Sequence, residues 1–211
     1  MKIGVLGTGD VGKALGNAFI KLGHEVRMGS REAKNPKALE WAKTAGAKAS
    51  TGTLADAAKF GELVVLATLG GATEAVAKSI TDACKGKTVW DAANPLEFGP
   101  TGPHLSIAGN DSLGERVQKA MPGAHVVKCF NTVGHGLMFQ PKVAGGPPTM
   151  FIAGNADAAK KQTTELLKQF GWETADVGGI EGSRYLEAMC LVWVGYALRT
   201  GTWTHAFKLL K

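Results

Sequence analysis

The sequence has little of what builds disulfide frameworks, metal centres or membrane spans. Among its 211 residues there are only three cysteines, Cys84, Cys129 and Cys190, and no two of them have CxxC spacing. An odd number of widely spaced cysteines argues against a disulfide framework and against a metal site, so we expect reduced, buried thiols in a cytoplasmic protein. The longest apolar run, residues 188–198, is too short to span a bilayer, and no membrane partner is expected.

Long runs of one charge are also missing. The formal net charge is +6, but no basic stretch is interleaved with aromatic residues in the way that single-strand binding requires. Much of the excess lies in residues 21–48, which hold seven Lys and Arg against three acids. A local excess of this kind suits a phosphate-bearing cofactor, and we expect a small-molecule substrate and no nucleic acid as partners.

The order of apolar patterns predicts a Rossmann-type α/β fold, a doubly wound and mostly parallel sheet. Strand patterns alternate with helix patterns along most of the chain, and residues 94–113, rich in Gly and Pro, are expected to form a long surface loop. The expected strands are 3–6, 25–28, 63–67, 88–91, 125–130, 149–153 and 172–175, and the expected helices are 11–22, 36–44, 72–84, 112–120 and 156–170.

The pattern changes after Gly178-Gly179, where only helical signal remains. We therefore expect a nucleotide-binding domain over residues 1–178 and a small helical C-terminal extension over residues 179–211, broken at Gly195 or at Thr200-Gly201. Arg184 and Glu187 lie three residues apart and are expected to pair on one helical face.

A glycine pattern follows the first expected strand and opens the first expected helix. Glycines at positions 7, 9 and 12 fit GxGxxG in the context that a dinucleotide-binding loop requires. The first glycine permits a tight turn, the second lets a diphosphate approach the backbone, and the third lets the helix pack on the strand. The expected diphosphate loop is Gly7, Thr8, Gly9, Asp10, Val11 and Gly12.

The end of the second strand selects the cofactor. An NAD site places Asp or Glu there to bind the ribose hydroxyls, whereas this chain reads Met28-Gly29-Ser30-Arg31. Ser30 can donate a hydrogen bond to a 2′-phosphate, and Arg31 can pair with that phosphate and stack on adenine. Lys34 follows one turn later, so the sequence predicts NADP(H).

Further residues are expected at the same crevice because parallel strands point their carboxyl ends to one edge. Small residues leave room there for ribose and nicotinamide, and two asparagines offer amide groups, although each could equally be a turn or capping residue. The candidates are Thr68, Leu69, Ala93, Asn94, Asn131, Thr132 and Val133, and among the five histidines His135 is the best placed for chemistry.

These segments together resemble the NADPH-dependent coenzyme F420 reductases (F420H2:NADP oxidoreductases), relatives of the cytoplasmic domain of the STEAP metalloreductases. The resemblance is carried by the glycine loop, the Gly23-His24-Glu25-Val26 segment, the Gly29-Ser30-Arg31 turn, the Asn131-Thr132 loop and residues 183–187. It implies hydride transfer between NADP(H) and a deazaflavin (F420) or a flavin such as FMN or FAD, by a homodimer.

The resemblance also implies where the cofactor lies. It places the 2′-phosphate on Ser30 and Arg31, the diphosphate on residues 8–11, and the nicotinamide near Asn94 and the Thr132-Val133 loop. The sequence departs from the usual pattern of this family at two places. Asp10 occupies a position where such proteins often have Asn, and Gly70-Gly71 stand where they often have Pro and bulkier residues.

Transfer between two stacked rings needs mainly alignment, and the sequence shows no triad, metal cluster or carboxylate pair. Two alternatives stay open. An NADPH-dependent carbonyl or imine reductase would need a placed acid, for which His135 is the candidate, and a non-catalytic sensor would bind NADPH without oxidising it.

Overall fold

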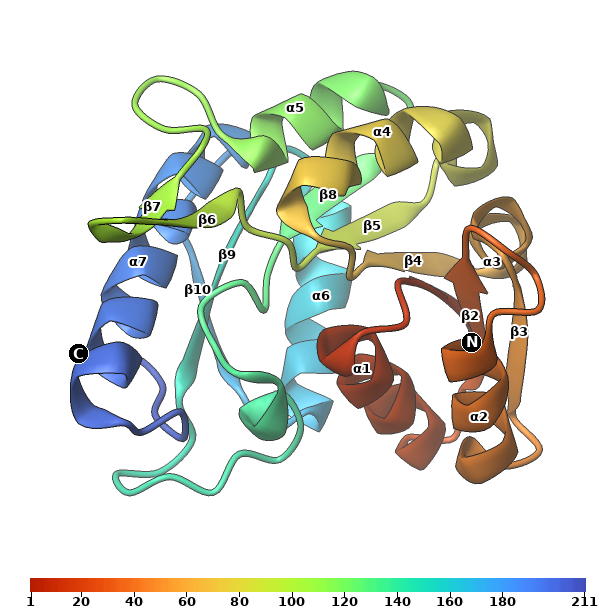
Figure 1. Cartoon of the computed structure of the whole chain (residues 1–211), viewed down its shortest axis with the longest axis horizontal. Helices are drawn as coiled ribbons and strands as arrows, with labels where there is room; N and C mark the ends of the chain where they lie inside the picture. Colours follow the sequence, from red (N-terminus) through yellow and green to blue (C-terminus); the bar gives the residue numbers. More distant parts are fainter.

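The computed structural model describes residues 1–211 as a mostly parallel sheet covered by helices on both faces (Figure 1). Its main strands are β1 (Lys2–Leu6), β2 (Glu25–Ser30), β3 (Ala49–Thr53), β4 (Leu63–Leu66), β5 (Thr88–Asp91), β8 (His125–Lys128), β9 (Thr149–Gly154) and β10 (Glu173–Asp176). They lie in the order β10-β9-β8-β5-β4-β1-β2-β3, and only the β8–β9 pair is antiparallel. The Rossmann-type fold predicted from the sequence is confirmed.

Seven helices complete the fold: α1 (Asp10–Lys21), α2 (Pro36–Ala45), α3 (Leu54–Phe60), α4 (Gly70–Ile80), α5 (Leu113–Ala120), α6 (Asp157–Gln169) and α7 (Ser183–Thr200). Successive strand side chains point to opposite faces, so each face has its own core. One core packs against α1, α2 and α6, the other against α3, α4 and α5, and Figure 1 shows α7 at the edge of the molecule far from α2.

Aromatic rings fill the first core beneath the carboxyl ends of β5 and β8. Phe19, Trp90, Phe130 and Phe170 contact one another with ring centroids 5.0–5.9 Å apart. All four are buried, and the Trp90 indole N–H donates to Thr163 Oγ1. This packing holds the sheet rigid where its loops leave it.

Four elements escaped the sequence prediction. β3 and α3 were not expected, and residues 94–113 contain a hairpin of β6 (Leu96–Gly99) and β7 (Gly102–Leu105). β3 is an edge strand of small and polar residues, which gives no apolar pattern to detect. The start of α3 did carry a readable signal, because Thr53 and Asp56 form a reciprocal capping box.

The C-terminal segment is helical only as far as Thr200. Gly201 adopts the left-handed conformation that ends α7, at one of the two breaks expected from the sequence. Residues 202–211 form no helix, so the expectation of helical structure after that break is wrong. The tail instead turns back to the start of β9, where Thr149 N–H donates to the Phe207 carbonyl. No helix of the protein has the length and apolar character needed to cross a membrane.

Candidate functional site

A cleft of about 760 Å³ opens at the carboxyl ends of β1, β2, β4 and β5. The chain runs from β1 outward to β3 and then returns to β4 on the other side of β1, so the cleft lies at the point where the strand order reverses. Ten of the predicted site residues line it: Gly7, Thr8, Gly9, Asp10, Val11, Ser30, Arg31, Thr68, Leu69 and His135.

The three loop glycines have different physical roles. Gly7 has a φ of +126°, and a Cβ there would overlap the Ala67 carbonyl; a Cβ on Gly12 would overlap the Gly7 carbonyl. Gly7 is therefore required by its backbone conformation and by the close approach of the loop after β4, and Gly12 by the packing of α1 on the loop after β1. A Cβ on Gly9 would meet no atom within 4 Å, so this position is open toward the cleft. The loop therefore fits a diphosphate laid on the N-terminus of α1.

Arg31, directly after β2, and Lys37 on α2 are the two basic side chains that line the cleft. Arg31 is exposed and its guanidinium makes no ion pair or hydrogen bond within the protein, so it is free to bind an anion. Ser30 is buried and its hydroxyl donates to the Glu32 carbonyl, which means that a 2′-phosphate would have to redirect that proton. Lys34 lies outside the cleft, and Lys37 from the first turn of α2 lines it instead.

The loop after β4 presents an unusual apolar side chain. Leu69 is 85% exposed at the N-cap of α4, although it lines the cleft. Beside it the hydroxyls of Thr68 and Thr73 are hydrogen-bonded at 2.8 Å. Gly70 explains one departure from the family pattern, because a Cβ there would overlap the Asn94 carbonyl.

The two predicted asparagines bind each other rather than facing the cleft. Asn131 Nδ2 donates to Asn94 Oδ1 at 2.9 Å, and Asn94 Nδ2 donates to the Asn131 carbonyl at 2.8 Å. The predicted residues that do not line the cleft are Gly12, Lys34, Ala93, Asn94, Asn131, Thr132 and Val133.

His135 is the candidate for acid–base chemistry, and the structure brings it to the cleft. It begins a short 3₁₀ turn, His135–Leu137, and its exposed ring makes no hydrogen bond that would orient it. Asp10 is the only lining carboxylate, at the first turn of α1. The cleft therefore has binding groups but no paired acid and base.

Eight further lining residues were missed by sequence reasoning. Most are small or apolar residues without a chemical signature, and Leu54 belongs to the undetected helix α3. Lys37 and Asn35 could have been found, because both lie in the basic segment that follows Arg31. The set is Gly29, Asn35, Lys37, Leu54, Ala67, Ala72, Val76 and Ala92.

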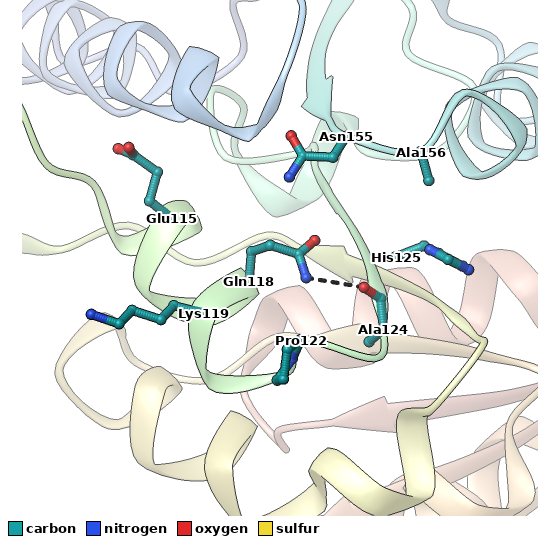
Figure 2. A pocket seen from close by; sticks show the side chains of 8 residues that line it. All are labelled: Glu115, Gln118, Lys119, Pro122, Ala124, His125, Asn155 and Ala156. Carbon is teal, nitrogen blue, oxygen red and sulfur yellow. Dashed lines mark hydrogen bonds between the residues drawn. The ribbon is translucent and has the colours of Figure 1, made fainter.

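A second cavity of about 570 Å³ lies at the opposite edge of the sheet, near the amino end of β8 (Figure 2). Two of its polar side chains are already hydrogen-bonded to the backbone. Gln118 Nε2 donates to the Ala124 carbonyl at 3.0 Å, as Figure 2 shows, and Asn155 Oδ1 accepts from Ile180 N–H. No group of three or more His, Cys, Asp or Glu side chains in the protein could hold a metal ion.

Comparison with known proteins agrees with this geometry. A family model described as coenzyme F420-dependent NADP oxidoreductase matches residues 2–95. The F420-dependent NADP reductase of Methanocaldococcus jannaschii is 30% identical over 212 positions, which cover 94% of this chain and 93% of that protein. The chain belongs to the F420-dependent NADP reductase family.

Further comparisons give similar proteins in structure and in sequence. The crystal structure of a candidate F420-dependent NADP reductase from Arthrobacter sp. FB24 superposes with a TM-score of 0.93 at 37% identity and covers all of both chains. Metalloreductase STEAP3 of Rattus norvegicus is 27% identical, over 90% of this chain and 36% of that protein. An imine reductase of Streptomyces aurantiacus, 20% identical with a TM-score of 0.66, shares the fold.

Proposed function

We propose that this protein is an NADP-dependent oxidoreductase that transfers a hydride between NADP(H) and the deazaflavin coenzyme F420. The observation that carries the proposal is a single cleft that joins the open glycine loop to the unpaired Arg31, in a chain related over 94% of its length to an F420-dependent NADP reductase. No acid stands at the end of β2 to favour NAD.

The residues present suit each part of the dinucleotide. The backbone amides of residues 8–11, at the positive end of α1, would hold the diphosphate. Arg31 and Lys37 would bind the 2′-phosphate, since both line the cleft beside the end of β2. The small residues Ala67 and Ala92, at the ends of β4 and β5, leave room for the ribose and the nicotinamide.

When bound, NADPH supplies a hydride from its nicotinamide ring. The contribution of the chain is to align that ring with the acceptor and to exclude water. Exposed Leu69 offers an apolar surface on which a flat acceptor ring can rest. A carbonyl acceptor would need a proton donor held in place, and the only candidate, His135, has no partner to orient it.

A panel of acceptors tests this proposal directly. NADPH oxidation would be followed with F420, FMN, FAD, a ferric chelate and a cyclic imine at equal concentration. We expect F420 to be reduced fastest and NADH to be a poor donor. Reduction of the imine alone would identify an imine reductase, and tight NADPH binding without oxidation by any acceptor would identify a sensor.

We also propose a homodimer formed through α7. Tyr185, Val192 and Tyr196 lie on one face of this helix and are 64%, 62% and 53% exposed. Ala188 and Gly195, both exposed, alternate with them and would allow close approach of a second helix. An apolar stripe of this kind commonly marks a protein interface, and a twofold axis would pair it with itself.

We propose further that the protein works in a reducing, cytoplasmic compartment. Cys84, Cys129 and Cys190 are all buried and unpaired. Burial raises the pKa of Cys84 and of Cys190 to about 11, so both thiols stay protonated and unreactive at neutral pH.

A further inference from the structure

The helix α7 reaches the sheet through a buried cluster of three charged side chains. Lys128 Nζ, at the end of β8, lies 2.9 Å from Asp91 Oδ2 at the end of β5 and 2.7 Å from Glu187 Oε1 on α7. None of the three side chains is more than 1% exposed. The pairing of Arg184 with Glu187 expected from the sequence is therefore wrong, because Glu187 turns inward and Arg184 binds Glu115.

The cluster carries one more negative than positive charge, and backbone amides compensate for it. Asp91 Oδ1 accepts from Ala93 N–H, and the two Glu187 oxygens accept from Leu113 N–H and Gly114 N–H at the start of α5, each at 3.0 Å. A carboxylate at a helix N-terminus is favourably placed. Burial by itself lowers the pKa of Lys128, but the two carboxylates outweigh it and hold that pKa above its usual value.

A second layer of buried bonds lies beside the cluster. Asn131 Nδ2 gives one proton to Asn94 Oδ1 and the other to the Leu186 carbonyl of α7, which fixes the orientation of its amide. Phe130, which precedes it, has a φ of +60°, a strained conformation for a bulky residue. Bonds to α7 on one side and aromatic packing on the other hold this turn in place.

We infer that Asp91, Lys128, Glu187, Asn94 and Asn131 form a positioning clamp through which α7 sets the loops after β5 and β8 for hydride transfer. Neither Lys128 nor Glu187 lines the cleft, so both act through other residues. Ala92, between Asp91 and Asn94, and His135, four residues after Asn131, do line it. The inference rests on the proposed function, which places the nicotinamide at this end of the cleft, whereas Arg31 and Lys37 bind at the other end.

The clamp predicts a split between affinity and turnover. Glu187→Gln keeps the shape of the side chain but removes its charge from Lys128, so the loops shift while the site of the 2′-phosphate does not. With F420 as acceptor we expect kcat to fall about tenfold or more and the KM for NADPH to stay within about twofold. The matched control is Arg184→Gln, which breaks the α7–α5 ion pair at Glu115 without touching β5 or β8, and should leave kcat within about twofold.

Amide hydrogen exchange of the protein without cofactor gives a readout that needs no turnover. Residues 129–134 should exchange about tenfold faster in Glu187→Gln than in Arg184→Gln. If Glu187→Gln does not fold, Asn94→Ala opens the other end of the clamp at a half-buried position and should loosen the same residues. Equal exchange of this segment in wild type and variants, or equal loss of kcat in both glutamine variants, would overturn the clamp. If no acceptor is reduced, the proposed function is wrong. The hydrogen exchange of residues 129–134 then tests the clamp without any measurement of turnover.

Discussion

At the scale of single residues, Arg31 is the side chain that we propose to select the cofactor. Its free guanidinium can form charged hydrogen bonds with a 2′-phosphate, an interaction of about 1.5–3 kcal/mol. Arg31→Ala should therefore weaken NADPH binding by roughly tenfold to 150-fold and leave NADH binding almost unchanged, as measured by fluorescence titration. Lys34→Ala is the matched control, since Lys34 lies outside the cleft. Equal losses for both cofactors would show that Arg31 does not bind the 2′-phosphate.

The loop glycines allow fold and binding to be separated. Gly9→Ala adds a methyl group in open space, so the thermal unfolding temperature should stay near that of wild type while NADPH affinity falls, because the methyl group keeps the diphosphate from the amides. Gly12→Ala pushes a methyl group against the Gly7 carbonyl and should lower the unfolding temperature. Unchanged NADPH affinity in Gly9→Ala would contradict the placement of the diphosphate.

His135 separates the two classes of reductase. A flavin-like acceptor takes the hydride into a conjugated ring and can collect its proton from solvent, so His135→Ala should keep turnover with F420 within roughly tenfold of wild type. NADPH affinity should not change. A loss beyond about 10² at constant NADPH affinity would indicate a placed general acid and would favour the carbonyl or imine reductase.

The sequence predicts best those positions where backbone geometry or charge allows few residue types. Gly7 and Gly12 have the close backbone contacts that the glycine motif predicts, and Gly9 and Arg31 line the cleft. The roles of Asn94 and Asn131 were not readable. An amide can bind a ligand or a neighbouring loop, and only the fold shows that these two bind each other.

At the scale of elements, α7 has an apolar inner face and an apolar outer stripe. If the stripe forms the dimer, Val192→Glu places a charge in the middle of the interface and should convert a dimer to a monomer in light scattering at micromolar concentration. Leu39→Glu on α2, also an exposed apolar position, is the control and should leave the dimer intact. A monomeric wild type would contradict the proposed interface.

Elements were predictable in proportion to how much apolar surface each one buries. β1 and β4 are wholly or almost wholly buried, and their continuous apolar runs gave correct strands. β3 is half-buried and has one apolar residue, and β6 and β7 form a short hairpin away from the main sheet. None of these three strands has the apolar pattern from which a strand is predicted. The sequence left two possible ends for α7, because Gly195 and Gly201 can each break a helix. The structure shows that only Gly201 has a positive φ, and the helix ends there.

For the whole molecule, chain order and buried contacts together assemble the site. Helical crossovers bring the carboxyl ends of β1, β2, β4 and β5 to the same side of the sheet. The alternation of strand and helix patterns in the sequence predicts this arrangement. The ion pair that joins α7 to β8 is formed by Lys128 and Glu187, which are 59 positions apart in the sequence. No local sequence pattern predicts such a contact. The inward turn of Glu187 is a property of the assembled fold.

The most direct test of the account follows the hydride itself. NADPH carrying deuterium at the transferred position of its nicotinamide ring would be incubated with F420 and the enzyme, and the reduced F420 analysed by mass spectrometry. The account predicts that each reduced F420 molecule gains one deuterium, in equal amount to the NADP⁺ formed. Oxidation of NADPH without label in F420, or no reduction of F420 while an imine or a carbonyl acceptor takes the label, would contradict it.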